Sequence, residues 1–255
     1  MWKKGTLAIL CFLVLCANLK AESVFSLDLK TDIALSALAI GVSISSLFIE
    51  IQPSQIPASL GRSDVNAFDR ALMVTRQSTA IKRISDVTIV SLGVFPVLSF
   101  LDNFNVNTVL TYGVMYSQAM LLAYGSRMLL KNNVTRFRPY LHDGRELRSD
   151  HRHDSFPSGH TCAAFLSATF FSTTFSLEHP DSRWRWPVVI GSHVLAASVG
   201  AMRMMAGMHF LTDVLTGAVM GSLYGWLIPY LHRNRNARNI PVKVTGNGLL
   251  VSLRL

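Results

Sequence analysis

The sequence is short of charge. Only 15% of its 255 residues are Asp, Glu, Lys or Arg, whereas these four types make up about 25% of a typical soluble domain. Half of the chain is hydrophobic and the mean hydropathy is +0.34. Disorder is excluded, because a disordered chain needs low hydrophobicity and a high density of charge. Too few charges remain to solvate a water-soluble globule, so the composition favours a membrane protein.

Cysteine is also scarce. Cys11 and Cys16 share an N-terminal apolar run, and Cys162 lies in a later one. This spacing excludes a disulfide framework and a CxxC metal site. The motifs of nucleic-acid-binding folds are missing as well. The net charge of +9 therefore indicates an anionic membrane surface or a phosphorylated substrate rather than nucleic acid.

The N-terminus resembles a targeting segment. Two lysines precede an apolar run from Thr6 to Ala17, and small residues follow at Ala21 and Ser23. The pattern is typical of a secretory signal peptide, and an uncleaved N-terminal anchor is the alternative. We expect residues 1–23 to be one or the other.

Further apolar segments predict an all-α fold, a polytopic transmembrane bundle of about six helices. A bilayer core needs about 20 helical residues. These segments lie near residues 33–49, 87–101, 108–130, 161–177, 187–202 and 210–231.

The parts outside these segments have patterns of their own. Apolar residues at helical spacing over 62–83 predict an amphipathic helix, either along the lipid headgroups or packed on the bundle. Pro96 predicts a kink in 87–101. Alternating residues around Gly246-Asn247-Gly248 predict a β-hairpin in the tail. We expect a membrane domain over 24–232 and a basic tail over 233–255.

Basic residues near the spans predict the orientation. Arginines at 233, 235 and 238 follow the last segment, and Arg183 and Arg185 precede 187–202. Both groups favour a cytoplasmic location, which places the loop 131–159 on the outer side. Lys3 and Lys4 would then also lie outside if both 6–17 and 33–49 crossed. Either one of these segments does not span, or the topology is inverted.

Three polar clusters sit at the ends of apolar segments, where charge is costly in a membrane. Lys131 and Arg138 follow the third segment, Ser158-Gly159-His160 opens the fourth, and Arg203, His209 and Asp213 precede or open the last. Each cluster alone has an ordinary explanation, such as snorkelling basic residues or a helix cap.

Together the clusters describe an oxyanion pocket. His209 and Asp213 are four residues apart and would share a helix face, so that the carboxylate orients a nucleophilic imidazole. Backbone N–H groups at Ser158 and Gly159 would bind an anion at a helix start. Lys131, Arg138 and Arg203 would supply its counter-charges.

The three clusters resemble the signature of the type-2 phosphatidic acid phosphatase (PAP2) superfamily. In this sequence it reads Lys131-x6-Arg138-Pro139, then Pro157-Ser158-Gly159-His160, then Arg203-x5-His209-x3-Asp213. One position departs from the pattern, because Met202 stands where the family usually has serine before the arginine.

The resemblance implies phosphate transfer without a metal or other cofactor. His209 would form a phosphohistidine, Asp213 would orient it, and His160 would protonate the leaving group and then activate water. The other positions, Lys131, Arg138, Ser158, Gly159 and Arg203, would bind the phosphate. An acidic cluster at metal-ligand spacing is absent from the sequence.

The expected substrate is a membrane lipid phosphomonoester or diphosphate: lipid A, undecaprenyl diphosphate, phosphatidylglycerol phosphate or phosphatidate. The expected location is the bacterial inner membrane, with the site facing the periplasm. The loop 140–154 predicts a basic rim or a merely solvated loop. A secreted acid phosphatase, a vanadate-dependent haloperoxidase and a non-catalytic lipid-phosphate-binding protein are the competing interpretations.

Overall fold

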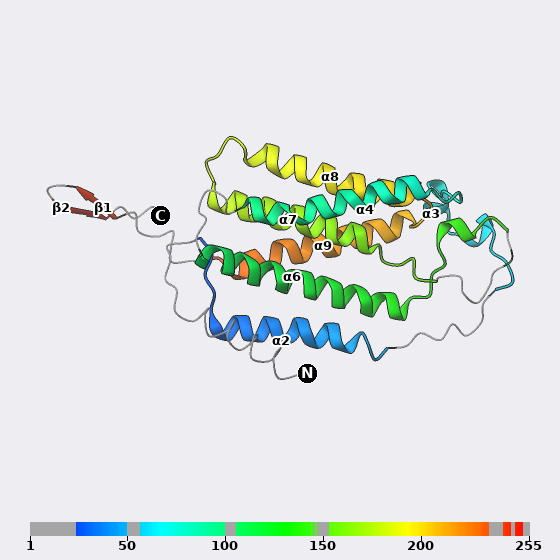
Figure 1. The fold of residues 1–255 in the computed structure, drawn as a ribbon, viewed down its shortest axis with the longest axis horizontal. Coiled ribbons are helices and arrows are strands. Elements are labelled where there is room, and N and C mark those ends of the chain that lie inside the picture. The colour runs from blue at the N-terminus through cyan, green and yellow to red at the C-terminus, as the bar shows by residue number, and fades with distance from the viewer. Residues whose placement is uncertain are drawn as a thin grey trace.

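The structure, a computed structural model, is a bundle of long helices that run alongside one another (Figure 1). It describes residues 24–49, 57–99, 106–144, 146 and 153–234, and the backbone of two tail strands. The elements are α2 (Leu29–Ser45), η2 (Arg62–Asp64), α3 (Ala67–Ala71), α4 (Thr79–Gly93), α5 (Phe95–Leu98), α6 (Val106–Asn133), η3 (Pro139–Leu141), α7 (Gly159–Glu178), α8 (Arg185–Met205), α9 (Leu211–Leu231), β1 (Val242–Thr245) and β2 (Gly248–Val251).

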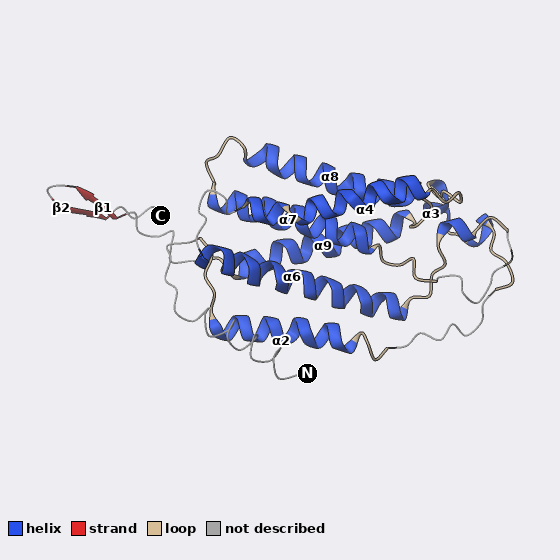
Figure 2. Cartoon of the chain, in the orientation of Figure 1, coloured by secondary structure: helices blue, strands red, loops and turns tan. Residues whose placement is uncertain are grey.

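The predicted all-α fold is confirmed, and each apolar segment corresponds to a helix (Figure 2). The segment 33–49 begins four residues earlier than expected, because Asp28 caps α2 by accepting the Thr31 N–H at 2.9 Å. The kink predicted at Pro96 is present as a break between α4 and α5, with the proline in the first turn of α5. Among the described helices, α8 and α9 are long and apolar enough to cross a membrane.

The single amphipathic helix predicted over 62–83 is wrong. This segment forms η2 and α3, then an irregular stretch, and α4 begins only at Thr79. Ser78 caps α4 by accepting the Ile81 N–H, so the chain starts a new helix there. Asp69 of α3 is fully buried. Periodicity did not reveal that these residues are packed against the loop before α9.

The centre of the bundle is α7, which packs most extensively against α9 and also contacts α8 and α4. The close approach to α9 depends on three glycines of that helix, which are spaced four residues apart at positions 217, 221 and 225. A Cβ atom at Gly221 would lie 2.1 Å from the Cys162 carbonyl oxygen, and one at Gly217 would lie 2.5 Å from that of Ser158. The two backbones are therefore in direct contact.

Two apolar cores flank this central pair. The larger core lies among α2, α6, α7 and α9 and includes Phe25, Tyr112 and Phe170. The smaller core lies among α4, α7 and α8, and Met202 packs against it. Met202, the departure from the family pattern, therefore serves as a packing residue.

The tail hairpin is confirmed in its backbone. Strands β1 and β2 pair antiparallel, with Val242 opposite Val251 and Thr245 opposite Gly248. The expected signal or anchor, residues 1–23, lies outside the described residues, so that interpretation stays a prediction.

The course of the chain brings several helix ends together. The start of α4, the end of α6, the start of α7, the end of α8 and the start of α9 all lie at the end of the bundle where α3 is found (Figure 1). The three sequence motifs are located at these ends.

Candidate active site

A cavity of about 360 Å³ opens at this end of the bundle. Of the residues predicted for the site, six line the cavity: Lys131, Arg138, Gly159, His160, Arg203 and His209. The other two predicted residues, Ser158 and Asp213, are fully buried and are not part of the cavity lining. They contact residues that are.

His209 is held in one orientation by a backbone carbonyl. The sequence predicts that His209 lies on a helix together with Asp213. In the structure it lies two residues before α9 begins. Its Nδ1 is 2.7 Å from the Ser155 carbonyl oxygen, which can only accept a hydrogen bond. Nδ1 therefore carries the proton and Nε2 has the free electron pair. Burial lowers the pKa of His209, although the Asp213 carboxylate opposes that shift.

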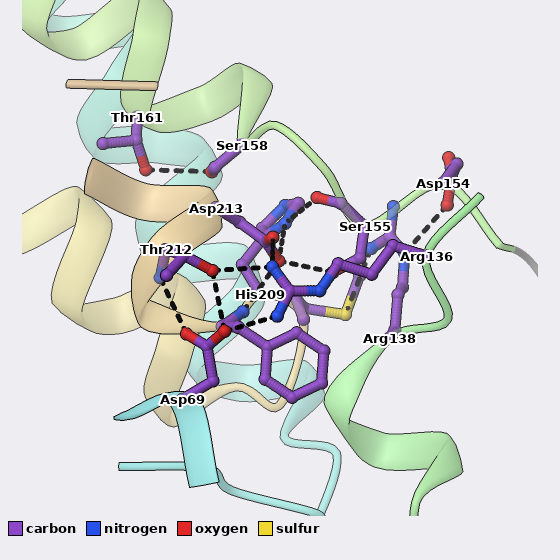
Figure 3. A network of polar contacts seen from close by, with 12 residues as sticks. Asp69, Arg136, Arg138, Asp154, Ser155, Ser158, Thr161, His209, Thr212 and Asp213 are labelled. Atoms are coloured by element: carbon purple, nitrogen blue, oxygen red, sulfur yellow. Dashed lines mark hydrogen bonds and ion pairs between the residues drawn. The ribbon is translucent and has the colours of Figure 1, made fainter. Parts of the chain in front are cut away.

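Asp213 acts on His209 less directly than the sequence predicts. Its Oδ2 is 3.7 Å from His209 Nδ1, which is too long for a hydrogen bond. This oxygen accepts instead from the Ser155 hydroxyl at 2.6 Å and from the Phe210 N–H at 2.8 Å. Asp213 therefore fixes Ser155, whose carbonyl oxygen orients the imidazole, and Phe210, which follows His209 in the chain. Figure 3 shows Asp213, Ser155 and His209 together.

Two residues that the motif analysis missed hold Asp213 in place. Arg136 Nη1 donates to Asp213 Oδ1 at 2.5 Å, and its Nη2 donates to Asp69 Oδ2 at 2.5 Å. Asp69 is buried and also accepts from the Thr212 N–H at 2.9 Å. Burial alone would raise the pKa of Asp69, but the Thr212 N–H and the hydrogen bonds from Asn66 and Arg136 outweigh it and lower that pKa.

Asp154 bridges two of the predicted phosphate-binding cations. One carboxylate oxygen is 3.0 Å from Lys131 Nζ and the other is 3.0 Å from Arg138 Nε. Burial would raise the pKa of Asp154, but the hydrogen bonds and charges of Arg138 and Lys131 outweigh it and lower that pKa. The two positive charges are thus partly offset by one ionised carboxylate.

Asp86 from α4 bridges two other predicted site residues, Arg203 and His160. Its Oδ1 is 2.8 Å from Arg203 Nη1 and 3.0 Å from His160 Nε2. Arg203 is 3% exposed, and its Nε has no hydrogen-bond partner within the described part of the chain. A buried guanidinium nitrogen without an acceptor is costly, so Nε is suited to an oxygen of a bound anion.

The start of α7 faces the cavity. Ser158 is its N-cap residue, and the Ser158 hydroxyl is 2.9 Å from that of Thr161. The Ser158 N–H donates to the Asp213 carbonyl oxygen at 3.0 Å. Gly159 begins the helix, and its N–H has no acceptor one turn back within the helix. The backbone at Gly159 is therefore the part of this predicted anion site that faces the cavity.

The loop 140–154 lies only partly within the described residues. Of its histidines, His142 is buried, with its ring 5.5 Å from that of Phe210, and His153 packs against Phe137. Burial lowers the pKa of His142. The basic residues at 145, 148 and 152 lie outside the described ranges, so the basic rim stays a prediction. Within those ranges no group of three or more His, Cys, Asp or Glu side chains could hold a metal ion.

The fold and the cavity thus define a helical bundle with a pocket at one end that is lined by basic residues and two histidines. The family model of the PAP2 superfamily matches residues 112–237. This matched segment, just under half of the chain, contains all three motifs and carries the sequence pattern of the superfamily.

Two known proteins are similar to this chain. A lipid A 1-phosphatase from Porphyromonas gingivalis is 32% identical over 104 residues, which are 39% of this chain and 22% of that protein. The match thus spans about a fifth of the relative's length. The crystal structure of a transmembrane PAP2 type phosphatidylglycerolphosphate phosphatase from Bacillus subtilis covers 91% of this chain and 96% of its own, with 21% identity and a TM-score of 0.46.

Proposed function

We propose that this protein is a membrane-embedded phosphatase that removes phosphate from a lipid phosphomonoester or diphosphate. The observation that carries the proposal is the cavity itself. Its lining includes the motif cations and both histidines. It also includes the less polar residues Ile89, Met120, Ala123, Tyr124 and Ala163, here together called the apolar wall. This combination suits a phosphorylated headgroup and the first part of its hydrocarbon chain.

His209 is the nucleophile in the proposed reaction. Its Nε2 attacks phosphorus while the bond from phosphorus to the leaving oxygen breaks, and His160 gives that oxygen a proton. Water then attacks the phosphohistidine and gives a proton to His160, which releases phosphate and restores His209. Lys131, Arg138 and Arg203 bind the phosphoryl oxygens, where negative charge is concentrated.

The outer faces of the bundle support a location in the membrane. Large apolar side chains are exposed on all of the long helices except α7, an area of apolar surface that an aqueous environment would disfavour. Carbonate washing of membranes is expected to leave the protein in the pellet, whereas a secreted acid phosphatase would be released. The most exposed of these residues include Leu38 on α2, Val87 and Val90 on α4, Ile190 and Val194 on α8, and Val219 on α9.

The end of the bundle opposite the cavity has features that favour a periplasmic site in a bacterial inner membrane. At this end Arg183 precedes α8, Arg185 is the first residue of α8, and Arg233 follows α9. Trp184 and Trp186 are exposed beside them. Positive charge favours the cytoplasmic side and tryptophan favours the interface. This end then faces the cytoplasm and the cavity faces outward.

The direct test is phosphate release from a panel of lipid phosphates in detergent. We expect release in the presence of EDTA, because fixed cations rather than a metal neutralise the phosphate in this proposal. Release confined to small soluble esters would instead favour a non-specific acid phosphatase. No release from any substrate, by protein that is folded, would contradict the proposal and favour a lipid-phosphate-binding protein.

The pH dependence follows from the lowered pKa of His209. A lowered pKa means that the imidazole loses its proton at a lower pH and is already neutral below the ordinary value of about 6.5. The acid limb of kcat/KM is therefore expected below that value. In Asp213→Asn the limb is expected to move further down, because the Asp213 charge raises the pKa of His209. The ionisation of the substrate is common to both proteins, so an unmoved limb would contradict the assignment.

Asp213→Asn is expected to lower kcat by about 10- to 100-fold, a partial loss. The hydrogen bond from His209 Nδ1 to the Ser155 carbonyl oxygen remains, while the anionic acceptor of Ser155, Phe210 and Arg136 is lost. Initial rates at saturating substrate measure the effect. A loss as complete as that from removing His209 would show that Asp213 has a more direct role.

A further inference from the structure

Arg127 is a fourth cation in the cavity, and it lies outside the three motifs. It is on α6, one turn before Lys131, and both side chains line the cavity. Its guanidinium lies against the start of α7: a Cβ atom at Gly159 would be 3.0 Å from Arg127 Nη1 and 3.2 Å from Cζ. Arg127 is therefore beside the backbone that is proposed to bind the phosphate.

Arg127 differs from the three motif cations, because each of those has a carboxylate partner. Lys131 and Arg138 share Asp154, and Arg203 contacts Asp86. Within the described residues, by contrast, Arg127 has no carboxylate partner. Its contacts there are the Tyr124 ring, 5.3 Å from Cζ, and the Met128 sulfur, 3.3 Å from Nη2. A half-buried guanidinium with only these neighbours retains donors for another anion.

The position of Arg127 along α6 indicates where that anion would be. Four helical residues advance about 6 Å, so Arg127 lies about one turn from Lys131 toward Ala123 and Met120, which line the apolar wall. A lipid with its reacting phosphate at Lys131 and its chain along this wall would place the linking group at Arg127.

We propose that Arg127 forms a second anion subsite, which binds the non-reacting phosphoryl group of a lipid diphosphate. The inference rests on the proposed function and narrows its substrate class. His209 attacks the terminal phosphorus, the bridging oxygen leaves with a proton from His160, and the product is a lipid monophosphate whose phosphoryl group faces Arg127. The subsite selects diphosphates over monophosphates of the same chain.

The test compares farnesyl diphosphate with farnesyl monophosphate on purified full-length protein in detergent. Arg127→Gln is expected to lower the ratio of kcat/KM for the diphosphate to kcat/KM for the monophosphate by about 10-fold or more, the scale of a lost charge-assisted hydrogen bond. Arg127→Lys keeps the charge and is expected to retain part of the ratio. Arg83→Gln, at an exposed arginine on α4, is the matched control and leaves the ratio unchanged.

A second measurement separates this inference from the proposed function. Binding of farnesyl diphosphate to His209→Ala protein is expected to weaken about 10-fold or more when Arg127→Gln is added. If both substrates are hydrolysed and Arg127→Gln changes neither the ratio nor the binding, the subsite is refuted and the phosphatase proposal stands. If folded wild-type protein hydrolyses neither farnesyl substrate nor any lipid phosphate of the panel, both proposals fail. Thermal unfolding of each variant confirms that it is folded.

Discussion

Replacement of His209 by alanine is expected to abolish phosphate release, lowering kcat by at least about 10⁴-fold. Two described histidines line the cavity, and only in His209 is Nδ1 fixed by a carbonyl oxygen. The variant therefore removes the histidine whose Nε2 has its electron pair free to attack phosphorus. The remaining cations would still bind the phosphate without forming a bond to phosphorus. Initial rates with the preferred lipid phosphate, with EDTA present, measure the loss.

His193→Gln is the matched control for this variant. His193 is also a histidine in the helical bundle, but its Nδ1 contacts the Val189 carbonyl oxygen and its Nε2 contacts the Thr169 hydroxyl, away from the cavity. We expect its activity to stay within about twofold of wild type where the fold is retained. Unchanged turnover in His209→Ala protein would exclude the phosphohistidine mechanism.

The largest expected effect on stability is that of Gly221→Val. A Cβ atom there would lie 2.1 Å from the Cys162 carbonyl oxygen and 2.8 Å from the Leu166 nitrogen, both of which are backbone atoms of α7. Backbone atoms cannot move aside as a side chain would, so the two helices must separate. We expect the free energy of unfolding to fall by about 3 kcal/mol or more. The measurement is the midpoint of thermal unfolding in detergent, which should be lower than that of wild type.

Gly191→Val tests whether the effect is due to this contact. Gly191 is exposed on α8, and a Cβ atom there meets no atom within 4 Å. The same substitution is expected to change the free energy of unfolding by only about 0.5 kcal/mol, so that the unfolding midpoint stays within a few degrees of wild type. Equal midpoints for the two variants would mean that α7 and α9 do not depend on the glycine contact.

The sequence draws attention to the motif residues because their clusters lie at the ends of apolar segments, and six of the eight predicted residues line one cavity. What the sequence did not reveal are their partners from distant parts of the chain. Asp86 is 117 residues before Arg203, and Asp69 is 67 residues before Arg136. Neither aspartate has a distinctive local pattern. Only the folded chain places these carboxylates against the arginines.

The failed prediction over 62–83 has a similar cause. Its apolar spacing is compatible with one helix, and the sequence signals that break it are weak. The break is stabilised by tertiary contacts: Asp69 is tied to Thr212 and Arg136, and the Ser78 N–H donates to the Ala206 carbonyl oxygen. The sequence does not single out Arg127, because it lies outside the motifs and an arginine near the end of an apolar run usually snorkels.

The two carboxylates at the cavity have a consequence for how substrate enters and product leaves. Asp154 and Asp86 already contact Lys131, Arg138, Arg203 and His160. In the proposed reaction, an incoming phosphate exchanges with these side-chain anions instead of meeting bare positive charge. The affinity of the site then reflects a difference between two competing sets of ion pairs. When hydrolysis is complete, the carboxylates compete with inorganic phosphate for the same cations and favour its departure.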